Sequence, residues 1–283
     1  SETDIFIFSD APRHSSDEDS VSEVRDYISG ICGFKSITII KRSFNLGLAT
    51  SVITGVSEII ERFGKVIVLE DDLVTSRYFL RYMNDSLNFF QYNSRVMSVS
   101  AYCYPFVMPS HYNHDVFAFY RFSSWGWGTW KDRWNTCDFE ITYENKIFKD
   151  RGLQKRLNMG GDDLYDMLRM QMEGSINSWA IRFAVAHSLN DQVSIYPSVS
   201  LVKNIGHDSS GTHCKSTDRW SVELNNAYPV KVQNVSLDKL VVKNLQVSLR
   251  KSLLSKINYK AKRFVKWFLP NYRYGLFDLI NNR

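Results

Sequence analysis

The first hundred residues alternate between short runs of β-branched apolar residues and longer stretches with helical periodicity. The short runs predict strands at 5–8, 36–40, 66–69 and 96–101. The longer stretches predict helices at 17–31, 48–63 and 76–92. Such alternation is typical of an α/β domain with a mainly parallel central sheet.

After about residue 102 the pattern becomes irregular and aromatic, and residues 123–130 are expected to form a glycine-aromatic loop. Further strands are predicted at 117–122 and 193–196, and further helices at 153–158, 162–173 and 179–189. A chain of 283 residues with 44% hydrophobic residues can bury a sizeable core. We expect one domain over 1–215 and an extension over 216–283.

The extension contains a predicted basic amphipathic helix at about 245–269, and it carries much of the net charge of +5. One stripe of this helix is apolar, and lysines and arginines cover most of the rest. The pattern favours an anionic membrane surface, with a helix packed on its own domain as the alternative. We expect no nucleic-acid partner. No stretch approaches the ~18 apolar residues of a membrane span.

The four cysteines have neither metal-ligand spacing nor a disulfide-like arrangement. Reduced thiols and a cytoplasmic location are therefore expected.

Three adjacent carboxylates, Glu70-Asp71-Asp72, end the apolar run Val66–Leu69. Side chains that follow a buried strand lie at the sheet edge where open α/β folds bind ligands. Their mutual repulsion is offset by water or by a cation, and Mg²⁺ and Mn²⁺ prefer one or two carboxylates plus phosphate oxygens. The alternative is a solvated acidic loop, and the flanking strand favours the cation.

Two further motifs combine glycine with polar or aromatic residues. Asn45-Leu46-Gly47 lies between a strand and a helix, where backbone amides bind an anion or form an ordinary turn. The segment Trp125–Gly128 alternates tryptophan with glycine. Exposed rings there would suit the C–H faces of a sugar, and buried rings would form a core corner.

Two polar segments offer groups for proton transfer or phosphate binding. Residues 206–213 include His207 and His213, which suit a metal or a leaving pyrophosphate, or simply belong to a surface loop. Gly160–Asp163 opens a predicted helix, so its aspartates serve as an N-cap or as a general base.

These segments occur in an order that resembles a known family. The segments are 45–48, 66–73, 98–101, 121–130, 178–182, 196–200 and 205–213. Their sequence resembles the GT-A-fold glycosyltransferases related to N-acetylglucosaminyltransferase I, and more closely their bacterial relatives from polysaccharide gene clusters. The resemblance covers roughly residues 4–214.

The resemblance implies a GT-A, Rossmann-like nucleotide-diphospho-sugar transferase fold and an inverting, metal-dependent hexosyl- or N-acetylhexosaminyltransferase. Asp72 would bind Mn²⁺ or Mg²⁺, and Glu70 and Asp71 would hydrogen-bond the sugar and the ribose of a UDP-sugar. The other implied donor-binding residues are Asn45, Gly47, Trp125, Gly126, Trp127, Trp179, Arg182, His207, Thr212 and His213. The acceptor would be a glycan or a lipid-linked glycan at the cytoplasmic face of a bacterial membrane.

The chain departs from the family pattern in two places. The resemblance implies that the family's opening strand, with its nucleobase contacts, should lie before Ile5, and this sequence does not contain it. The resemblance also places the catalytic aspartate just before Trp179, at a position where this chain has Asn177.

Three explanations for Asn177 at this position stay open. A nearby carboxylate serves as the base, the motif is aligned one or more residues off, or the protein lacks a catalytic base. The substitute candidates are Asp162, Asp163, Asp166 and Glu173. The competing functions are a non-catalytic carbohydrate-binding protein and a metal-dependent sugar-nucleotide hydrolase.

Overall fold

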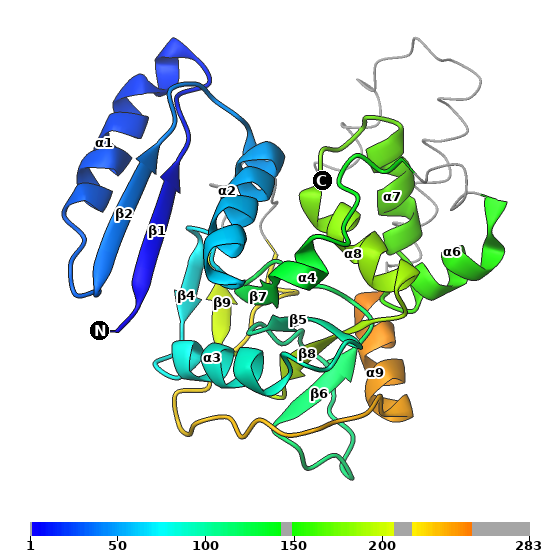
Figure 1. The fold of residues 1–283 in the computed structure, drawn as a ribbon. Helices are drawn as coiled ribbons and strands as arrows, with labels where there is room; N and C mark the ends of the chain where they lie inside the picture. Colours follow the sequence, from blue (N-terminus) through cyan, green and yellow to red (C-terminus); the bar gives the residue numbers. More distant parts are fainter. Residues whose placement is uncertain (1, 143–148, 207–216, 251–283) are drawn as a thin grey trace. The chain divides into compact units, whose positions relative to one another are not determined.

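The computed structural model describes residues 2–142, 149–206 and 217–250, and in this part of the chain the strands form three sheets (Figure 1). The first sheet has two parallel strands, β1 (Asp4–Ser9) and β2 (Ser36–Lys41). A short 3₁₀ helix, η1 (Ser15–Asp17), precedes α1 (Glu18–Ser29), which connects the two strands. Arg25 of α1 donates from Nη2 to the carbonyls of Asp10 and Arg42, which follow the two strands.

The central sheet has five strands in the order β3-β7-β5-β8-β6. Their bounds are β3 (Lys65–Val68), β7 (Trp127–Trp130), β5 (Val96–Ser100), β8 (Val193–Pro197) and β6 (Val116–Phe119). Only the β5–β8 pair is parallel, and β7 and β6 run against their neighbours. The chain is thus a mixed α/β protein whose sheet arrangement is compatible with a Rossmann-like fold.

The expectation of a mainly parallel central sheet holds in part: β3, β5 and β8 run in one direction, and β7, which was expected to be a loop, and β6 run in the other. Residues 127–130 pair with both β3 and β5 in antiparallel register. Gly128 permits this insertion, since a Cβ at that position would lie 2.8 Å from the carbonyl oxygen of Val66. The glycine that suggested a loop in fact admits a central strand to a crowded position.

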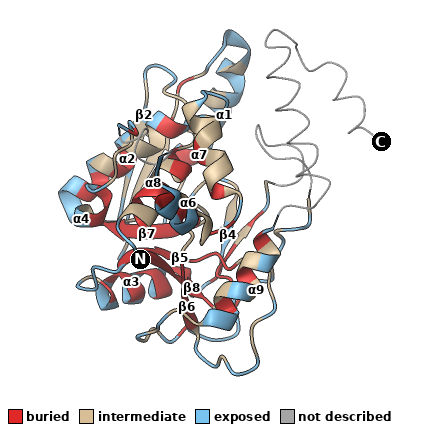
Figure 2. Ribbon diagram, turned by 90° about the vertical axis from the view of Figure 1, so that its right-hand side faces the viewer, coloured by how far each residue is buried: buried red, intermediate tan, exposed pale blue. Residues whose placement is uncertain are grey.

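Helices cover both faces of the central sheet. On one side α2 (Leu48–Phe63) and α8 (Trp179–Leu189) contribute to a core that also includes α6 (Arg151–Asn158) and α7 (Leu164–Met172). On the other side α3 (Phe79–Phe89) packs on the strands, and Leu87 accepts a hydrogen bond from Trp130 Nε1. Every residue of β5, β6 and β8 is buried, as the red strands of Figure 2 show. A short helix, α4 (Lys131–Trp134), follows β7 directly.

The predicted bounds of two helices are confirmed without change, since α2 and α8 begin and end at the expected residues. Helix α2 also lies against β1, because a Cβ at Gly55 would meet the Phe8 ring at 3.3 Å. A third sheet pairs β4 (Leu73–Thr75) with β9 (Val202–Asn204) in antiparallel register. This small sheet begins immediately after the acidic triplet.

Residues Ser1–Ser248 group into one compact unit, which extends past the boundary that the sequence placed between 215 and 216. Asn225 donates its backbone N–H to Ser200, and Gln246 donates its side-chain amide to the carbonyl of Met159. These bonds tie the segment after residue 216 to the rest of this unit. The helix α9 (Lys239–Leu249) begins before the predicted position 245.

Most of the predicted basic helix, residues 251–269, lies outside the described residues. Within the described ranges, no helix is both long and apolar enough to cross a membrane.

Candidate functional site

The acidic triplet lies at the carboxyl end of β3, between that strand and β4. The carboxyl end of β5 and the start of β7 reach the same edge, because Ser100 pairs with Trp127 and Trp127 pairs with Val68. Asp71 is exposed, and Glu70 and Asp72 are half-buried. The structure therefore places the triplet at the sheet edge that the sequence predicted.

The two carboxylate oxygens of Asp72 have different surroundings. Oδ2 accepts a hydrogen bond of 2.8 Å from Asn204 Nδ2. Oδ1 is buried and has no hydrogen-bond partner among the residues that the structure describes. A buried carboxylate oxygen without a partner is costly, so it fits a bound cation or a ligand hydrogen-bond donor.

The surroundings of Glu70 disfavour its negative charge. Burial, together with the negative charges of Asp72 and Asp71, raises the pKa of Glu70 to about 7. Near neutral pH a fraction of this side chain is therefore a neutral carboxylic acid, which donates a hydrogen bond as well as accepting one. Such a group suits a sugar hydroxyl.

The triplet offers a cation one well-placed ligand rather than three. In the described part of the chain, no group of three or more His, Cys, Asp or Glu side chains is arranged to hold a metal. Mg²⁺ is commonly held by one or two protein carboxylates, with water and phosphate oxygens completing its shell. Asp72 suits the role of such a carboxylate ligand, and its unpartnered oxygen Oδ1 is the atom that would contact the cation.

The loop before β7 lies beside the triplet. Gly126 has a φ of 65°, and a Cβ there would lie 2.7 Å from Val202 Cγ2 and 3.5 Å from Leu69 Cδ2. The glycine is thus required both by its backbone conformation and by the close packing. Its neighbour Trp125 is half-buried and packs edge-on against Tyr102, with ring centroids 4.6 Å apart.

Trp127 and Trp179 are corrected from donor-binding residues to core residues. Trp127 is 0% exposed and Trp179 is 3% exposed. Their rings stack with centroids 5.2 Å apart, and Phe122 and Phe183 pack around them. Rings enclosed in this way present no face to a sugar, so both belong to the core.

The turn that Asn45 and Gly47 form contains a carboxylate of the chain itself. Asp10, which follows β1, accepts backbone hydrogen bonds of 2.9–3.0 Å from Leu46 and 3.0 Å from Gly47. Asn45 donates its side-chain amide to the carbonyl of Ala11 at 2.7 Å. These amides bind an internal anion, and the sequence reasoning overlooked Asp10.

The base candidates differ in how their carboxylates are held. Asp163 forms a two-fold hydrogen-bonded ion pair with Arg121, at 2.8 and 2.9 Å, and both side chains are largely buried. Asp163 occupies the N-cap position of α7 without capping it through its side chain. A carboxylate fixed in this way is a weak proton acceptor.

The other candidates are more accessible or already bonded. Asp166 pairs with Arg169 at 3.2 Å. Asp162 and Glu173 are exposed. Asn177 is exposed too, and its Oδ1 accepts a hydrogen bond of 2.6 Å from Arg182 Nη2 in the first turn of α8.

His207, Thr212 and His213 lie outside the described residues. The described chain ends there at Gly206, whose N–H donates to Asn204 Oδ1 at 2.8 Å. Asn204 was not among the predicted site residues. Its only sequence signal was its place just before the segment 205–213.

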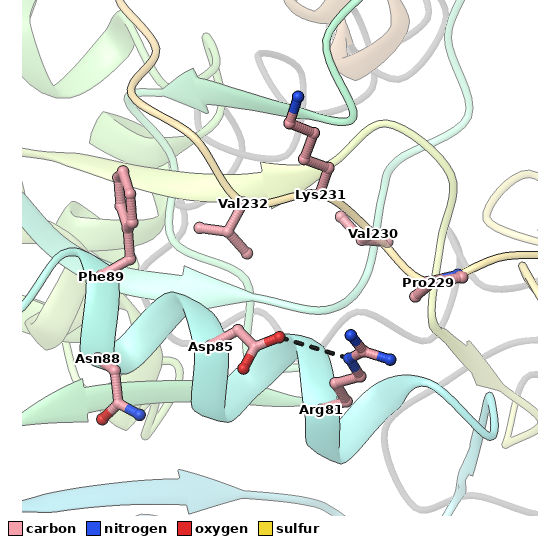
Figure 3. A pocket seen from close by; sticks show the side chains of 8 residues that line it. All are labelled: Arg81, Asp85, Asn88, Phe89, Pro229, Val230, Lys231 and Val232. Carbon is pink, nitrogen blue, oxygen red and sulfur yellow. Dashed lines mark ion pairs between the residues drawn. The ribbon is translucent and has the colours of Figure 1, made fainter.

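A separate surface groove of about 590 Å³ lies between α3 and the extended segment 229–232 (Figure 3). It contains none of the predicted site residues. Arg81 and Asp85 form an exposed ion pair of 3.7 Å on its wall. Nothing in its lining indicates chemistry.

In comparisons with known proteins, no family model matches the chain, and the curated proteins contain no match to it.

Proposed function

We propose that this protein is a metal-dependent, inverting glycosyltransferase that moves a sugar from a UDP-sugar to a hydroxyl of a glycan or lipid-linked glycan. The observation that carries the proposal is the asymmetric environment of Asp72. One oxygen is held by Asn204, and the other is buried without a partner in the described part of the chain, just after the carboxyl end of β3. The order of the sequence motifs, which resembles that of GT-A enzymes, supports a sugar nucleotide as the ligand of this site.

Asp72 would hold Mn²⁺ or Mg²⁺ through Oδ1. When bound, the metal supplies positive charge to the diphosphate of the leaving nucleotide. Glu70, half-buried and two residues before Asp72, would hydrogen-bond a hydroxyl of the sugar. Trp125, half-buried beside Gly126, offers a ring to the apolar face of the sugar.

Inversion at the anomeric carbon requires a base on the side of the sugar opposite the leaving group. Asp163 is the weakest candidate because Arg121 holds it as an ion pair. We propose that Asp162 or Glu173, which are both exposed, takes the proton from the acceptor hydroxyl.

One observation favours a second function. Asn177 stands where the resemblance places the catalytic aspartate, and its side chain is hydrogen-bonded to Arg182. An amide does not accept a proton at neutral pH. A carbohydrate-binding protein that binds the sugar nucleotide without turnover is therefore the alternative.

Release of UDP separates these functions. Purified protein is incubated with a panel of UDP-sugars and Mn²⁺, with and without a mixture of glycan acceptors, and UDP is quantified. A transferase releases UDP only when both Mn²⁺ and an acceptor are present. Release without acceptor indicates a hydrolase, and Mn²⁺-dependent binding without release indicates the binding protein.

We further propose that the reaction takes place at the cytoplasmic face of a bacterial membrane. The support is the sequence pattern of the basic tail, most of which lies outside the described residues. Deleting residues 251–283 should reduce binding to anionic liposomes, because the lysines and arginines of the tail are attracted to acidic lipids. Undiminished binding would remove the membrane proposal and leave the transferase proposal intact.

A further inference from the structure

Asn204 uses both ends of its side-chain amide in one small network. Nδ2 donates to Asp72 Oδ2 at 2.8 Å, and Oδ1 accepts from the N–H of Gly206 at 2.8 Å. The side chain is only 9% exposed. The register of β4 and β9 accounts for this meeting, because Leu73 pairs with Asn204 and Ile205 donates its N–H to the carbonyl of Asp72 at 2.9 Å.

The network determines how the Asp72 carboxylate is turned. A carboxylate group rotates about its terminal torsion over a broad range unless a partner fixes it. The hydrogen bond from Asn204 engages Oδ2, so Oδ1 is the oxygen left buried without a partner in the described part of the chain. The chain itself thus holds this carboxylate in one orientation.

Gly206 contributes by leaving space. A Cβ at this position would lie 2.6 Å from Asp72 Oδ2 and 3.2 Å from Asp72 Cγ. The first distance is far below van der Waals contact, so any larger residue pushes the carboxylate away from its bonded position. The glycine also keeps its N–H close enough to bond Asn204.

We propose that Asn204 and Gly206 are positioning residues that hold the Asp72 carboxylate with Oδ1 directed at the cation. This inference rests on the proposed function and names the residues that tune its metal site. Hydrogen-bond partners behind a metal ligand typically contribute about 10- to 100-fold to metal affinity. Without Asn204, the carboxylate is free to turn and the buried oxygen loses its fixed direction.

The test uses Asn204→Leu, which keeps the branching at Cγ, is larger, and can make neither hydrogen bond. Binding of Mn²⁺ in the presence of UDP is followed by loss of the free-Mn²⁺ signal in electron paramagnetic resonance. Calorimetry gives the affinity for UDP without metal. We expect Mn²⁺ affinity to fall at least tenfold and metal-free UDP affinity to stay within about twofold. A Mn²⁺ affinity within twofold of the native protein would overturn the proposal.

Gly206→Ala provides a second, independent disturbance of the same carboxylate. It leaves Asn204 in place and adds only the methyl group that meets Asp72 Oδ2. We expect a similar loss of Mn²⁺ affinity, and this variant decides the matter if Asn204→Leu fails to fold. The matched control is Lys203→Met, whose side chain leaves β9 on the opposite face from Asn204. An equal loss in the control would attribute the effect to the strand and overturn the proposal.

Mn²⁺ binding by the native protein distinguishes a failure of the proposed function from a failure of the positioning role alone. If native protein with UDP does not bind Mn²⁺, the proposed function and the positioning role both fail. If native protein binds Mn²⁺ and both variants bind it equally well, only the positioning role fails.

Discussion

Asp10 and Asp72 both follow a strand at the edge of a sheet, yet their carboxylates differ in what remains available. Asp10 follows β1, and its oxygens accept backbone hydrogen bonds from Leu46 and Gly47. Asp72 lies between β3 and β4, and it keeps one buried oxygen without a partner in the described residues. A carboxylate after a strand is therefore a turn-former in one case and a candidate ligand site in the other. Its hydrogen-bond inventory distinguishes the two.

The largest effect should come from Asp72→Asn. The amide keeps an oxygen for Asn204 but loses the charge that attracts a divalent cation. We expect the gain in UDP affinity caused by Mn²⁺ to fall at least 100-fold, or about 2.7 kcal/mol. The free energy of unfolding should not fall, because one of three adjacent negative charges is removed. Calorimetric titration of UDP with and without Mn²⁺ measures the first quantity, and urea unfolding measures the second.

Asp10→Asn should lower the free energy of unfolding and leave the Mn²⁺-dependent part of the UDP affinity unchanged. Hydrogen bonds to a charged acceptor contribute about 1.5–3 kcal/mol each, and the amide replaces that acceptor with a neutral one. We expect the free energy of unfolding to fall by about 2 kcal/mol. Any change in UDP affinity should be equal with and without Mn²⁺. A loss confined to the Mn²⁺-dependent part would show that Asp10 belongs with Asp72, and the comparison would fail.

Buried His187 makes the free energy of unfolding depend on pH, so the variants above are compared at one fixed pH. It is 0% exposed, and burial lowers its pKa to about 3. The unfolded chain binds a proton near pH 6.5 and the folded chain does not, so stability is lost as pH falls below that value. We expect about 1.4 kcal/mol of loss at pH 5.5 from this group alone. Urea unfolding at pH 7.5 and 5.5 measures it, with His187→Gln as the variant in which this part of the pH dependence disappears.

The smallest effect concerns the sugar. Trp125→Ala should weaken binding of a UDP-sugar relative to UDP by about two- to twelvefold, because a ring contact contributes roughly 0.5–1.5 kcal/mol. Competition binding with both ligands measures the ratio. An unchanged ratio would leave Trp125 as a packing partner of Tyr102. The buried Trp127 is unsuitable as a control because its removal disturbs the core stack.

The sequence predicted the local elements well because their signals are local. The apolar spacing of 48–63 and 179–189 is enough to set both helices. The antiparallel strand β7 was missed, since pairing joins segments far apart and Gly128 is typical of a loop. Trp127 and Trp179 illustrate the same limit, because a tryptophan-glycine pattern does not reveal which rings are enclosed.

Of the candidate site, the sequence predicted the acidic triplet but not the residue that holds it. Glu70, Asp71 and Asp72 follow a recognisable strand, so their place at the sheet edge could be read from the chain. Asn204 lies 132 residues from Asp72 in the sequence, and Asp10 lies 36 residues from Leu46. Their roles depend on partners brought close by folding, so no local pattern indicates them.

The most direct test is a crystal structure of the protein with Mn²⁺ and UDP, with data collected to locate manganese by its anomalous scattering. The account predicts a manganese peak in contact with Asp72 Oδ1 and with diphosphate oxygens, while Asn204 stays bonded to Oδ2. UDP bound without manganese at Asp72, or manganese held elsewhere, would contradict it.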